Sequence, residues 1–316
     1  MTSSLNGSMR SEFSVIDRFF KKQSQNTQIR LGIGDDCALL SLPQGDELAV
    51  TTDTMVENVH FFADVNPYAL GHKLLAVNLS DLAAMAAKPI AVTLALTLPN
   101  IDEHWLAQFS AGFFALAACY GVDLIGGDTT QGPLTLTLQA MGTVPIGQAL
   151  TRRRASVGDL ICMSGFLGEA GLGLKMMQQT APPHESALLR FHQPIPRVET
   201  GLALRGVATA CIDISDGLAS DLGHILWQSQ VGACLEWDKL PLSEAVHTYI
   251  AQTGDYLMPL SAGDDYELCF TVPVNKRHEI PHGCTVIGVI EQERGLRLKK
   301  QEKLEILTVK GYAHFS

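Results

Sequence analysis

Residues Leu31 to Phe61 read LGIGDDCALLSLPQGDELAVTTDTMVENVHF, and their pattern constrains the interpretation of the whole chain. The stretch contains two carboxylate-bearing segments, Gly34-Asp35-Asp36 and Thr51-Thr52-Asp53-Thr54, which we expect to be turns bordered by apolar residues. The second follows Leu48-Ala49-Val50, a short apolar run that predicts a buried strand. Hydroxyls and a carboxylate at the end of a strand are hard oxygen ligands that suit magnesium. The alternative is that these aspartates form turns or cap helices for local reasons.

A long segment rich in Ala and Leu, residues 68–87, predicts a helix that is apolar on nearly all sides and therefore buried. It carries Asn78 and Asp81, which are three residues apart and so lie on one face. A buried carboxylate is unfavourable unless it is paired or bound to a metal ion. Asp81 is therefore either a structural residue, with Lys73 as a candidate partner, or a metal ligand.

Two further acidic segments follow predicted strands. Gly126-Gly127-Asp128-Thr129-Thr130 comes after an apolar strand at 122–125 and is expected to form a third acidic turn. Asp213 and Asp216 come at the end of a strand at 207–214, where the next helix begins. A carboxylate at a helix start is favourable in itself, so Asp216 also has a purely structural interpretation.

Taken together, these aspartates have a physical consequence if they converge. Carboxylates that lie close together repel each other and raise each other's pKa unless cations lie between them. A set of aspartates and threonine hydroxyls without a His/Cys ligand set predicts magnesium, with more than one ion. Several magnesium ions most often serve phosphoryl transfer. The chain has no G-x-x-x-x-G-K-[ST] loop, so any phosphate near Gly32-Ile33-Gly34-Asp35-Asp36 must be bridged by metal.

Length and composition limit the number of domains and the classes of function that the chain can have. A chain of 316 residues can bury a sizeable core, and two domains are expected, at 1–149 and 150–316. The formal net charge of −10 argues against nucleic-acid binding. Seven scattered cysteines without a C-x-x-C pair indicate a reduced, cytoplasmic protein. We expect no transmembrane helix, and we expect residues 1–8 to be a flexible tail.

The order of predicted elements indicates a mixed α/β or α+β fold. Helices are predicted at 13–22, 68–87, 103–120 and 169–179, and strands at 90–98, 122–125, 134–144, 160–163, 207–214, 267–272 and 285–290. Ser164 to Gly168 can be interpreted as a phosphate loop, but we favour a glycine-rich turn and helix start.

The motifs carry a resemblance to a known family. In the same order, bacterial thiamine-monophosphate kinases contain the segments that read here Gly32–Asp36, Thr51–Phe61, Asn78–Met85, Gly126–Thr130, Asp213–Leu218 and Asp265–Leu268. The resemblance runs from about residue 12 to 315 and places the chain in the aminoimidazole ribonucleotide synthetase superfamily. It implies an N-terminal mixed α/β domain that binds metal and ATP and forms a homodimer, and a C-terminal α+β domain. It also implies transfer of the ATP γ-phosphoryl group to thiamine monophosphate.

The resemblance further implies a set of site residues. The positions that match magnesium ligands, direct or through water, are Asp36, Thr51, Thr52, Asp53, Asp81, Asp128, Asp213 and Asp216. Those that match ATP contacts are Gly127, Asp128, Arg152 and Ser215, and those on the thiamine side are His60, Asp264 and Tyr312. The sequence departs from the family pattern at Asp264, where a Glu is expected, and at Asn58, where a Gly is expected.

Structural interpretations remain open beside these roles. Arg152 can act on ATP phosphates or belong to a solvated basic linker with its neighbours, Arg153 and Arg154. His60 can be a partly buried histidine in an apolar turn, and Tyr312 can stack on a heteroaromatic substrate or only pack. No covalent nucleophile or general base is expected, because a phosphate monoester is mostly ionised at pH 7, with a second pKa of about 6.

Two other functions fit the same residues. One is another ATP-cleaving synthetase of the superfamily. Selenophosphate synthetase would carry a reactive Cys or selenocysteine in an N-terminal glycine-rich loop, and the hydrogenase maturation factor would end in Cys, whereas this sequence ends Ala313-His314-Phe315-Ser316. The other is a non-catalytic sensor that binds ATP and magnesium, which turnover would distinguish from a kinase.

Overall fold

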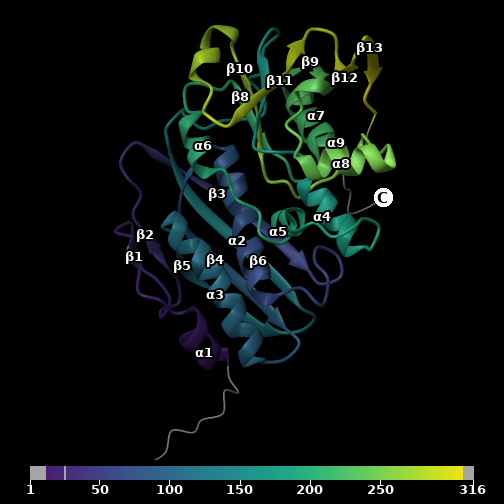
Figure 1. Cartoon of the computed structure of the whole chain (residues 1–316). Helices are drawn as coiled ribbons and strands as arrows, with labels where there is room; N and C mark the ends of the chain where they lie inside the picture. Colours follow the sequence, from purple (N-terminus) through teal and green to yellow (C-terminus); the bar gives the residue numbers. More distant parts are fainter. Residues whose placement is uncertain (1–11, 25, 309–316) are drawn as a thin grey trace, which may run out of the picture. The chain divides into compact units, whose positions relative to one another are not determined.

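The computed structural model describes residues 12–24 and 26–308 (Figure 1). Along the chain, the elements are α1 (Glu12–Val15), the π-helix η1 (Ile16–Phe20), β1 (Ile29–Leu31), β2 (Leu39–Leu40), β3 (Asp46–Val56), α2 (Pro67–Ala84), β4 (Lys88–Leu98), α3 (Glu103–Tyr120), β5 (Asp123–Gln131) and β6 (Thr135–Pro145). They continue with β7 (Leu160–Ser164), α4 (Glu169–Met177), α5 (Glu185–His192), α6 (Val198–Ala203), β8 (Ala210–Asp213), α7 (Leu218–Ser229), β9 (Gly232–Glu236), η2 (Trp237–Lys239), α8 (Glu244–Thr253), α9 (Met258–Ser261), β10 (Leu268–Val272), η3 (Val274–Glu279), β11 (Cys284–Glu291), β12 (Gly295–Lys300) and β13 (Lys303–Ile306).

The described chain divides into two compact units. Unit 1 comprises the described residues up to Gln44, together with Val50–Asn78 and Pro89–Gly142. Unit 2 comprises Gly45–Ala49, Leu79–Lys88 and the described residues from Thr143 onward. The last turns of α2 and the first residues of β3 therefore belong to unit 2.

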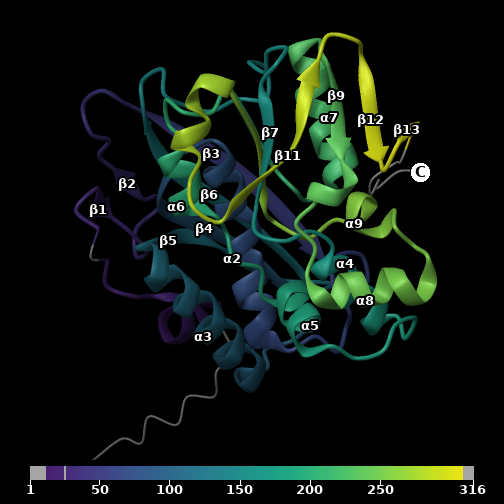
Figure 2. The same cartoon turned by 45° about the horizontal axis from the view of Figure 1, so that its top comes forward.

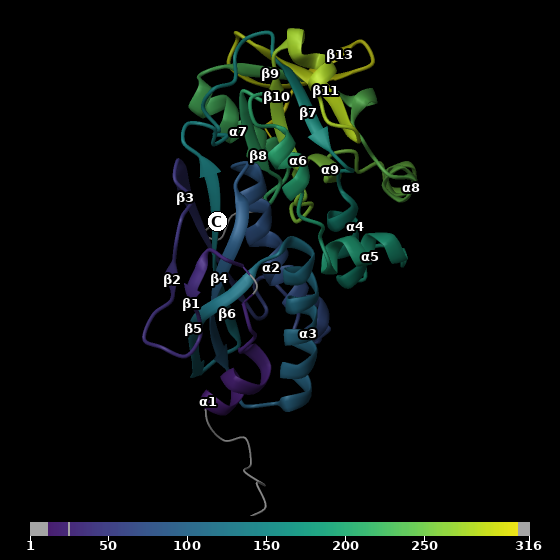
Figure 3. The same ribbon diagram turned by 90° about the vertical axis from the view of Figure 1, so that its left-hand side faces the viewer.

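Unit 1 is built on a four-stranded sheet with the order β3-β6-β4-β5, in which β4 and β5 run parallel. Helices α2 and α3 lie on one face of this sheet (Figure 3). Helix α3 has clear local signals, because Asp102 accepts hydrogen bonds from the first-turn N–H groups and Gly121 ends the helix in a left-handed conformation. From Ala69 to Ala84, only His72 and Asp81 are not buried, which confirms the prediction of a helix buried on nearly all sides.

Two glycines allow α2 and α3 to approach each other closely. A Cβ at Gly71 would lie 2.1 Å from the carbonyl oxygen of Phe109, and a Cβ at Gly112 would lie 1.9 Å from that of Tyr68. Both distances are shorter than any non-bonded contact, so neither position accepts a side chain without moving a helix. The backbones themselves form this contact, and the fully buried Phe109 and Phe113 extend it on α3.

Strand β3 corrects two predictions. Thr51-Thr52-Asp53-Thr54 is not a turn, because β3 continues without interruption from Asp46 to Val56. Leu48 and Val50 are not buried, since 43% and 51% of their surfaces are exposed. β3 is the outermost strand of its sheet, so one of its edges pairs with no strand of the unit 1 sheet. Side chains on such an edge strand can remain exposed to solvent.

Strand β5 corrects a third prediction. Gly126 to Thr130 lies within β5, which continues to Gln131, and Ala95 of β4 pairs with Asp128. The pairing shifts by one residue after Val92, which leaves Ile125 as an extra residue and bends the strand.

Unit 2 contains a seven-stranded sheet with the order β13-β12-β9-β11-β7-β10-β8. Its neighbouring strands are antiparallel except for β9 and β12. Helix α7 contacts β8 and β12, and α4 contacts α5, α8 and α9 (Figure 2). A core of buried residues from these strands and helices includes Ile161, Met163, Ile212, Leu222 and Leu298.

These two units confirm the predicted fold class, with mixed α/β and α+β arrangements of sheets and helices. The first predicted helix is shorter than expected, because residues 16–20 form a π-helix after α1. Within residues 12–24 and 26–308, every helix is too short or too polar to cross a membrane. The predicted flexible tail and Tyr312 lie outside the described residues.

Candidate functional site

The candidate site residues of unit 1 lie on separate strands and one loop. Asp36 is exposed in a bend between β1 and β2, Thr51 to Asp53 lie in β3, and Asp128 is exposed in β5. β3 and β5 form opposite edges of the sheet, with β6 and β4 between them. Three strand spacings separate them by about 14 Å. One copy of unit 1 therefore does not bring Asp53 and Asp128 to a single metal ion.

Gly127 has a structural reason to be glycine. It pairs with Leu94 of β4, its φ is +150°, and a Cβ would lie 1.9 Å from the Leu94 carbonyl oxygen. The close approach of the two strands thus requires a residue without a side chain.

His60 is held by the turn in which it lies. Its Nδ1 accepts a hydrogen bond from the Val56 N–H at 3.0 Å, and its own N–H donates to the Val56 carbonyl oxygen at 2.9 Å. Asn58 has a φ of +62°, a conformation that the Gly expected at this position would adopt without strain. His60 therefore orders this turn, whatever else it binds.

Asp213 is the most tightly enclosed aspartate of the predicted set. It ends β8, is 4% exposed, and accepts a hydrogen bond from the Ser80 hydroxyl at 2.7 Å. Burial raises its pKa well above the ordinary value, repulsion from Asp81 raises it further, and the Ser80 hydrogen bond opposes the increase. Unit 2 thus brings Asp81 and Asp213 together although they are far apart in sequence.

The Ser215 to Gly217 turn is fixed by a residue that the sequence analysis missed. The Asp221 carboxylate accepts hydrogen bonds from the backbone N–H groups of Ser215, Asp216 and Gly217 at 3.0, 3.0 and 3.1 Å. Burial raises the pKa of Asp221 to about 7, although these hydrogen bonds oppose the increase. An acidic residue in the first turn of the following helix is the only local signal for this role.

Asp264 lies beside the same turn. The Asp264 N–H donates a hydrogen bond to the Ser215 carbonyl oxygen at 2.9 Å. The Tyr266 N–H donates to the Ile214 carbonyl oxygen at 2.8 Å. Asp264 and Tyr266 have φ values of +66° and +49°, and the Tyr266 hydroxyl donates to the Asp264 carboxylate at 3.0 Å. A Cβ at Gly263 would lie 2.0 Å from the Ser215 carbonyl oxygen, so the two loops touch through their backbones.

The start of α4 is occupied by a carboxylate from the chain itself. Asp265 accepts hydrogen bonds from the N–H groups of Gly168 and Ala170 at 2.8 and 3.3 Å. The N–H groups of Gly168 and Ala170 at the start of this helix are therefore already occupied. This favours the interpretation of Ser164 to Gly168 as a glycine-rich turn and helix start rather than a phosphate loop.

Arg152 lies within electrostatic reach of the acidic residues of unit 2. Its side chain is exposed, and its positive charge lowers the pKa of Asp213 against the larger effects of burial and Asp81. Its backbone carbonyl accepts a hydrogen bond from Ser229 at 3.0 Å, which holds the segment beside α7.

Comparison with known proteins gives these features a context. Residues 34–144 match the family model described as AIR synthase related protein, N-terminal domain. Thiamine-monophosphate kinase from Escherichia coli (strain K12) is 45% identical over an alignment of 321 positions, gaps included, which covers 96% of this chain and 98% of that protein. This chain belongs to the thiamine-monophosphate kinase family.

Solved structures of the thiamine-monophosphate kinase family share the fold. The crystal structure of the enzyme from Stenotrophomonas maltophilia K279a is 44% identical, with a TM-score of 0.82 over 87% of this chain and 92% of that chain. The structure of AaThiL complexed with AMPPCP and TMP is 29% identical, with a TM-score of 0.78 over 90% and 92% of the two chains. The recognition from motifs and the predicted superfamily fold are both confirmed.

The donor atoms of this thiamine-monophosphate kinase family member fit magnesium. Asp81 and Asp213 disfavour each other's negative charge, and a divalent cation beside them would remove that cost. On α2, three residues before Asp81, the fully buried Asn78 has an Oδ1 atom without a hydrogen-bond partner among residues 12–24 and 26–308. No group of three or more His, Cys, Asp or Glu side chains in these ranges forms a metal site.

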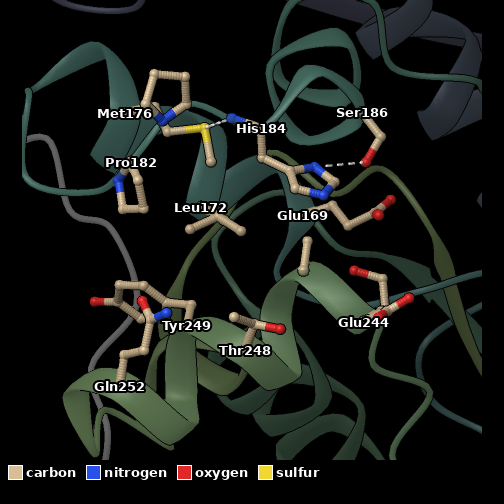
Figure 4. Close-up of a pocket in the computed structure, with 13 residues that line it drawn as sticks. Glu169, Leu172, Met176, Pro182, His184, Ser186, Glu244, Thr248, Tyr249 and Gln252 are labelled. Atoms are coloured by element: carbon tan, nitrogen blue, oxygen red, sulfur yellow. Dashed lines mark hydrogen bonds between the residues drawn. The ribbon is translucent and has the colours of Figure 1, made fainter.

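A pocket of ≈ 340 Å³ opens in unit 2 between α4, the loop before α5, and α8 (Figure 4). Its lining includes Glu169, Met176, His184, Glu244 and Tyr249. Among residues 12–24 and 26–308, none of the predicted site residues is part of its lining.

Proposed function

We propose that this protein transfers the γ-phosphoryl group of ATP to thiamine monophosphate, which yields thiamine diphosphate and ADP. The observation that carries the proposal is the buried Asp213, whose carboxylate accepts the Ser80 hydroxyl at 2.7 Å and lies close enough to Asp81 for the two charges to repel each other. Such a pair favours a divalent cation, and phosphoryl transfer is the chemistry that magnesium held by carboxylates most often serves. Relatives that are 45% identical over 96% of the chain carry the name thiamine-monophosphate kinase.

The proposed roles follow the family positions. Magnesium ions would be held by Asp36, Thr51, Thr52, Asp53, Asp81, Asp128, Asp213 and Asp216. ATP would contact Gly127, Asp128, Arg152 and Ser215, and thiamine monophosphate would contact His60, Asp264 and Tyr312. When bound, Mg²⁺ supplies charge neutralisation between the two phosphate groups.

The side chains of the protein have a positioning role. The acceptor is a phosphate monoester with a second pKa of about 6, so most of it is already ionised at pH 7 and needs no general base. Asp221 fixes the Ser215 to Gly217 turn through three hydrogen bonds, which keeps Ser215 and Asp216 in place before substrate binds. Arg152 adds positive charge near Asp213, where phosphate charge must be balanced.

A homodimer is part of the proposal. Asp53 and Asp128 lie on opposite edges of one sheet, so a second copy of the chain is needed to bring such residues together. The outer strand β3 exposes Leu48 and Val50, which suit contact with another copy. We assign metal and ATP binding and dimerisation to residues 1–149, and an α+β domain to residues 150–316. We place the protein in the cytoplasm, where free thiols such as the buried Cys162 and Cys211 persist.

The test is mass-spectrometric product analysis after incubation with ATP, Mg²⁺ and thiamine monophosphate. Free thiamine serves as a parallel acceptor. Thiamine diphosphate from the monophosphate alone is the expected result. ADP release at the same rate without thiamine monophosphate would refute the proposal. Tight ATP binding without turnover of any thiamine phosphate would favour a sensor instead.

A further inference from the structure

Glu267 is a fully buried carboxylate of unit 2. It accepts hydrogen bonds from the Ser164 hydroxyl at 2.5 Å and from Arg197 Nε at 2.6 Å. The Nη2 groups of Arg190 and Arg197 also donate hydrogen bonds to this carboxylate, at Oε1. A buried carboxylate is costly unless it is paired in this way, so the cluster has a fixed geometry.

The cluster ties four segments of unit 2 together. Arg190 comes from the last turn of α5, and Arg197 precedes α6. Ser164 ends β7 and also accepts the Leu268 N–H at 2.8 Å. A Cβ at Gly165 would lie 2.2 Å from Oε1 of Glu267, so the chain after β7 passes directly over the carboxylate.

Next to this cluster, the backbone is in an unfavourable conformation. Asp264 and Tyr266 both have positive φ values, which are unfavourable for residues other than glycine. Such residues persist only where the surroundings hold them. Glu267 directly follows Tyr266, and its carbonyl oxygen accepts the Ile214 N–H at 2.8 Å, which fixes the C-terminal end of the turn.

We infer that Glu267 is a positioning residue: its carboxylate, held by Arg190 and Arg197, keeps the Asp264 to Tyr266 turn in the left-handed conformation that places Asp264 beside Ser215. The inference rests on the proposed function for its consequence, which is that Glu267 controls the affinity for thiamine monophosphate through Asp264. Asp264 has a short side chain, so its reach depends on the position of this turn.

The first test does not depend on activity. Glu267→Asp keeps the charge but withdraws the carboxylate from the arginines, so hydrogen–deuterium exchange over residues 263–268 should increase about tenfold. Ser164→Ala removes the hydrogen bonds of this hydroxyl to Glu267 and from the Leu268 N–H but leaves both arginines in place, so it should give a smaller increase. Glu291→Asp, which shortens a carboxylate paired with Arg297 at 2.7 Å, is the matched control and should leave this segment unchanged. Unchanged exchange in folded Glu267→Asp overturns the inference, whether or not the protein is a kinase.

The second test is a double-mutant cycle on the KM for thiamine monophosphate. Glu267→Asp should raise this KM about tenfold and leave the KM for ATP within about twofold. In an Asp264→Ala background, Glu267→Asp should have no further effect, because the residue through which it acts is gone. Additive effects would overturn the inference while leaving the kinase proposal intact. A wild-type protein without product would refute the kinase proposal, and the exchange measurement would still decide the positioning role.

Discussion

The Ser80 hydroxyl lies 2.7 Å from Oδ2 of Asp213 and donates its hydrogen bond to that carboxylate. Ser80 comes from the last turns of α2 and Asp213 from the end of β8, and both are buried. The hydrogen bond favours the ionised carboxylate against burial and against the charge of Asp81. A carboxylate must be ionised to hold a cation, so Ser80 should influence metal binding without contacting the metal.

Ser80→Ala should therefore weaken magnesium binding. Loss of a hydrogen bond to a metal-binding group typically lowers metal affinity about 10–100-fold. We expect the Mg²⁺ concentration for half-maximal rate to rise about tenfold, with the maximal rate at saturating Mg²⁺ largely restored. Ser110→Ala is the matched control, because Ser110 is also a buried helix serine but donates to the Ala107 carbonyl oxygen. An equal shift in both variants would argue against a role of Ser80 in metal binding.

Asp53→Ala should abolish turnover while the protein stays folded. Asp53 is half-buried in β3, and a ligand that neutralises phosphate charge contributes several kcal/mol, which is about 100-fold or more in rate. Asp46→Ala, at the first residue of the same strand, is the control and should retain activity. The measurement is the steady-state rate with circular dichroism as the check on folding. A wild-type rate would remove Asp53 from the metal site.

Asp265 should make stability depend on pH. Burial raises its pKa from 3.8 to about 8, opposed by the Gly168 and Ala170 N–H groups. The protonated form is thus favoured in the folded state, so its stabilising contribution is complete below pH 3.8 and is lost as the pH rises through 8. The loss amounts to about 1.4 kcal/mol per pH unit between the two pKa values.

Asp265→Asn removes this titration. Between pH 5 and 8, the free energy of unfolding of the variant should rise relative to that of the wild type, as measured by urea denaturation. Asp238→Asn, which changes an exposed aspartate of unit 2, should follow the wild type at every pH. Parallel pH profiles for Asp265→Asn and wild type would contradict the expected titration.

Gly127→Ala should destabilise the protein through the β4–β5 contact. The added methyl group would collide with the Leu94 carbonyl oxygen, and forcing extra volume into a packed contact costs about 1–3 kcal/mol. Gly147→Ala also has a positive φ but open space around it, so it should show only the backbone cost of about 1–2 kcal/mol. Thermal denaturation of both variants measures the difference. Equal losses would mean that the strands move apart easily.

Elements with strong local signals were predictable from the sequence. The α3 prediction, residues 103–120, coincides with the observed bounds because Asp102 caps the helix and Gly121 ends it. β3 and β5 were predicted to end early, since threonine, glycine and aspartate in a row are typical of turns. Both are edge strands of their sheet and carry exposed polar residues, so the pattern of buried apolar residues that marks a strand is absent there.

At the candidate site, the contacts between residues could not be predicted for a different reason. Asp81 and Asp213 were recognised through the family motifs, but only the fold brings them together, because no local rule connects residues so far apart in sequence. Asp221 was missed, since an isolated acidic residue in a helix usually faces solvent. Glu267 lies in the motif Asp265–Leu268 but received no role, because its sequence neighbours do not indicate which residues it contacts. The hydrogen bond of Asp221 with Ser215 depends on the shape of one turn. The hydrogen bond of Glu267 with Arg197 joins two segments that are far apart in sequence. The positive φ of Tyr266 has no sequence signal at all, because tyrosine rarely adopts it.

The close approach of α2 and α3 at Gly71 and Gly112 limits how unit 1 can evolve. At each position the obstacle is a backbone carbonyl oxygen, of Phe109 or Tyr68, and not a side chain. A larger residue at one glycine therefore cannot be accommodated by a smaller neighbour elsewhere, as happens in an ordinary core. Neighbouring leucines can be exchanged in combination, whereas these two glycines can change only if a whole helix shifts. A combinatorial library of unit 1 should keep both positions constant and vary the residues around them.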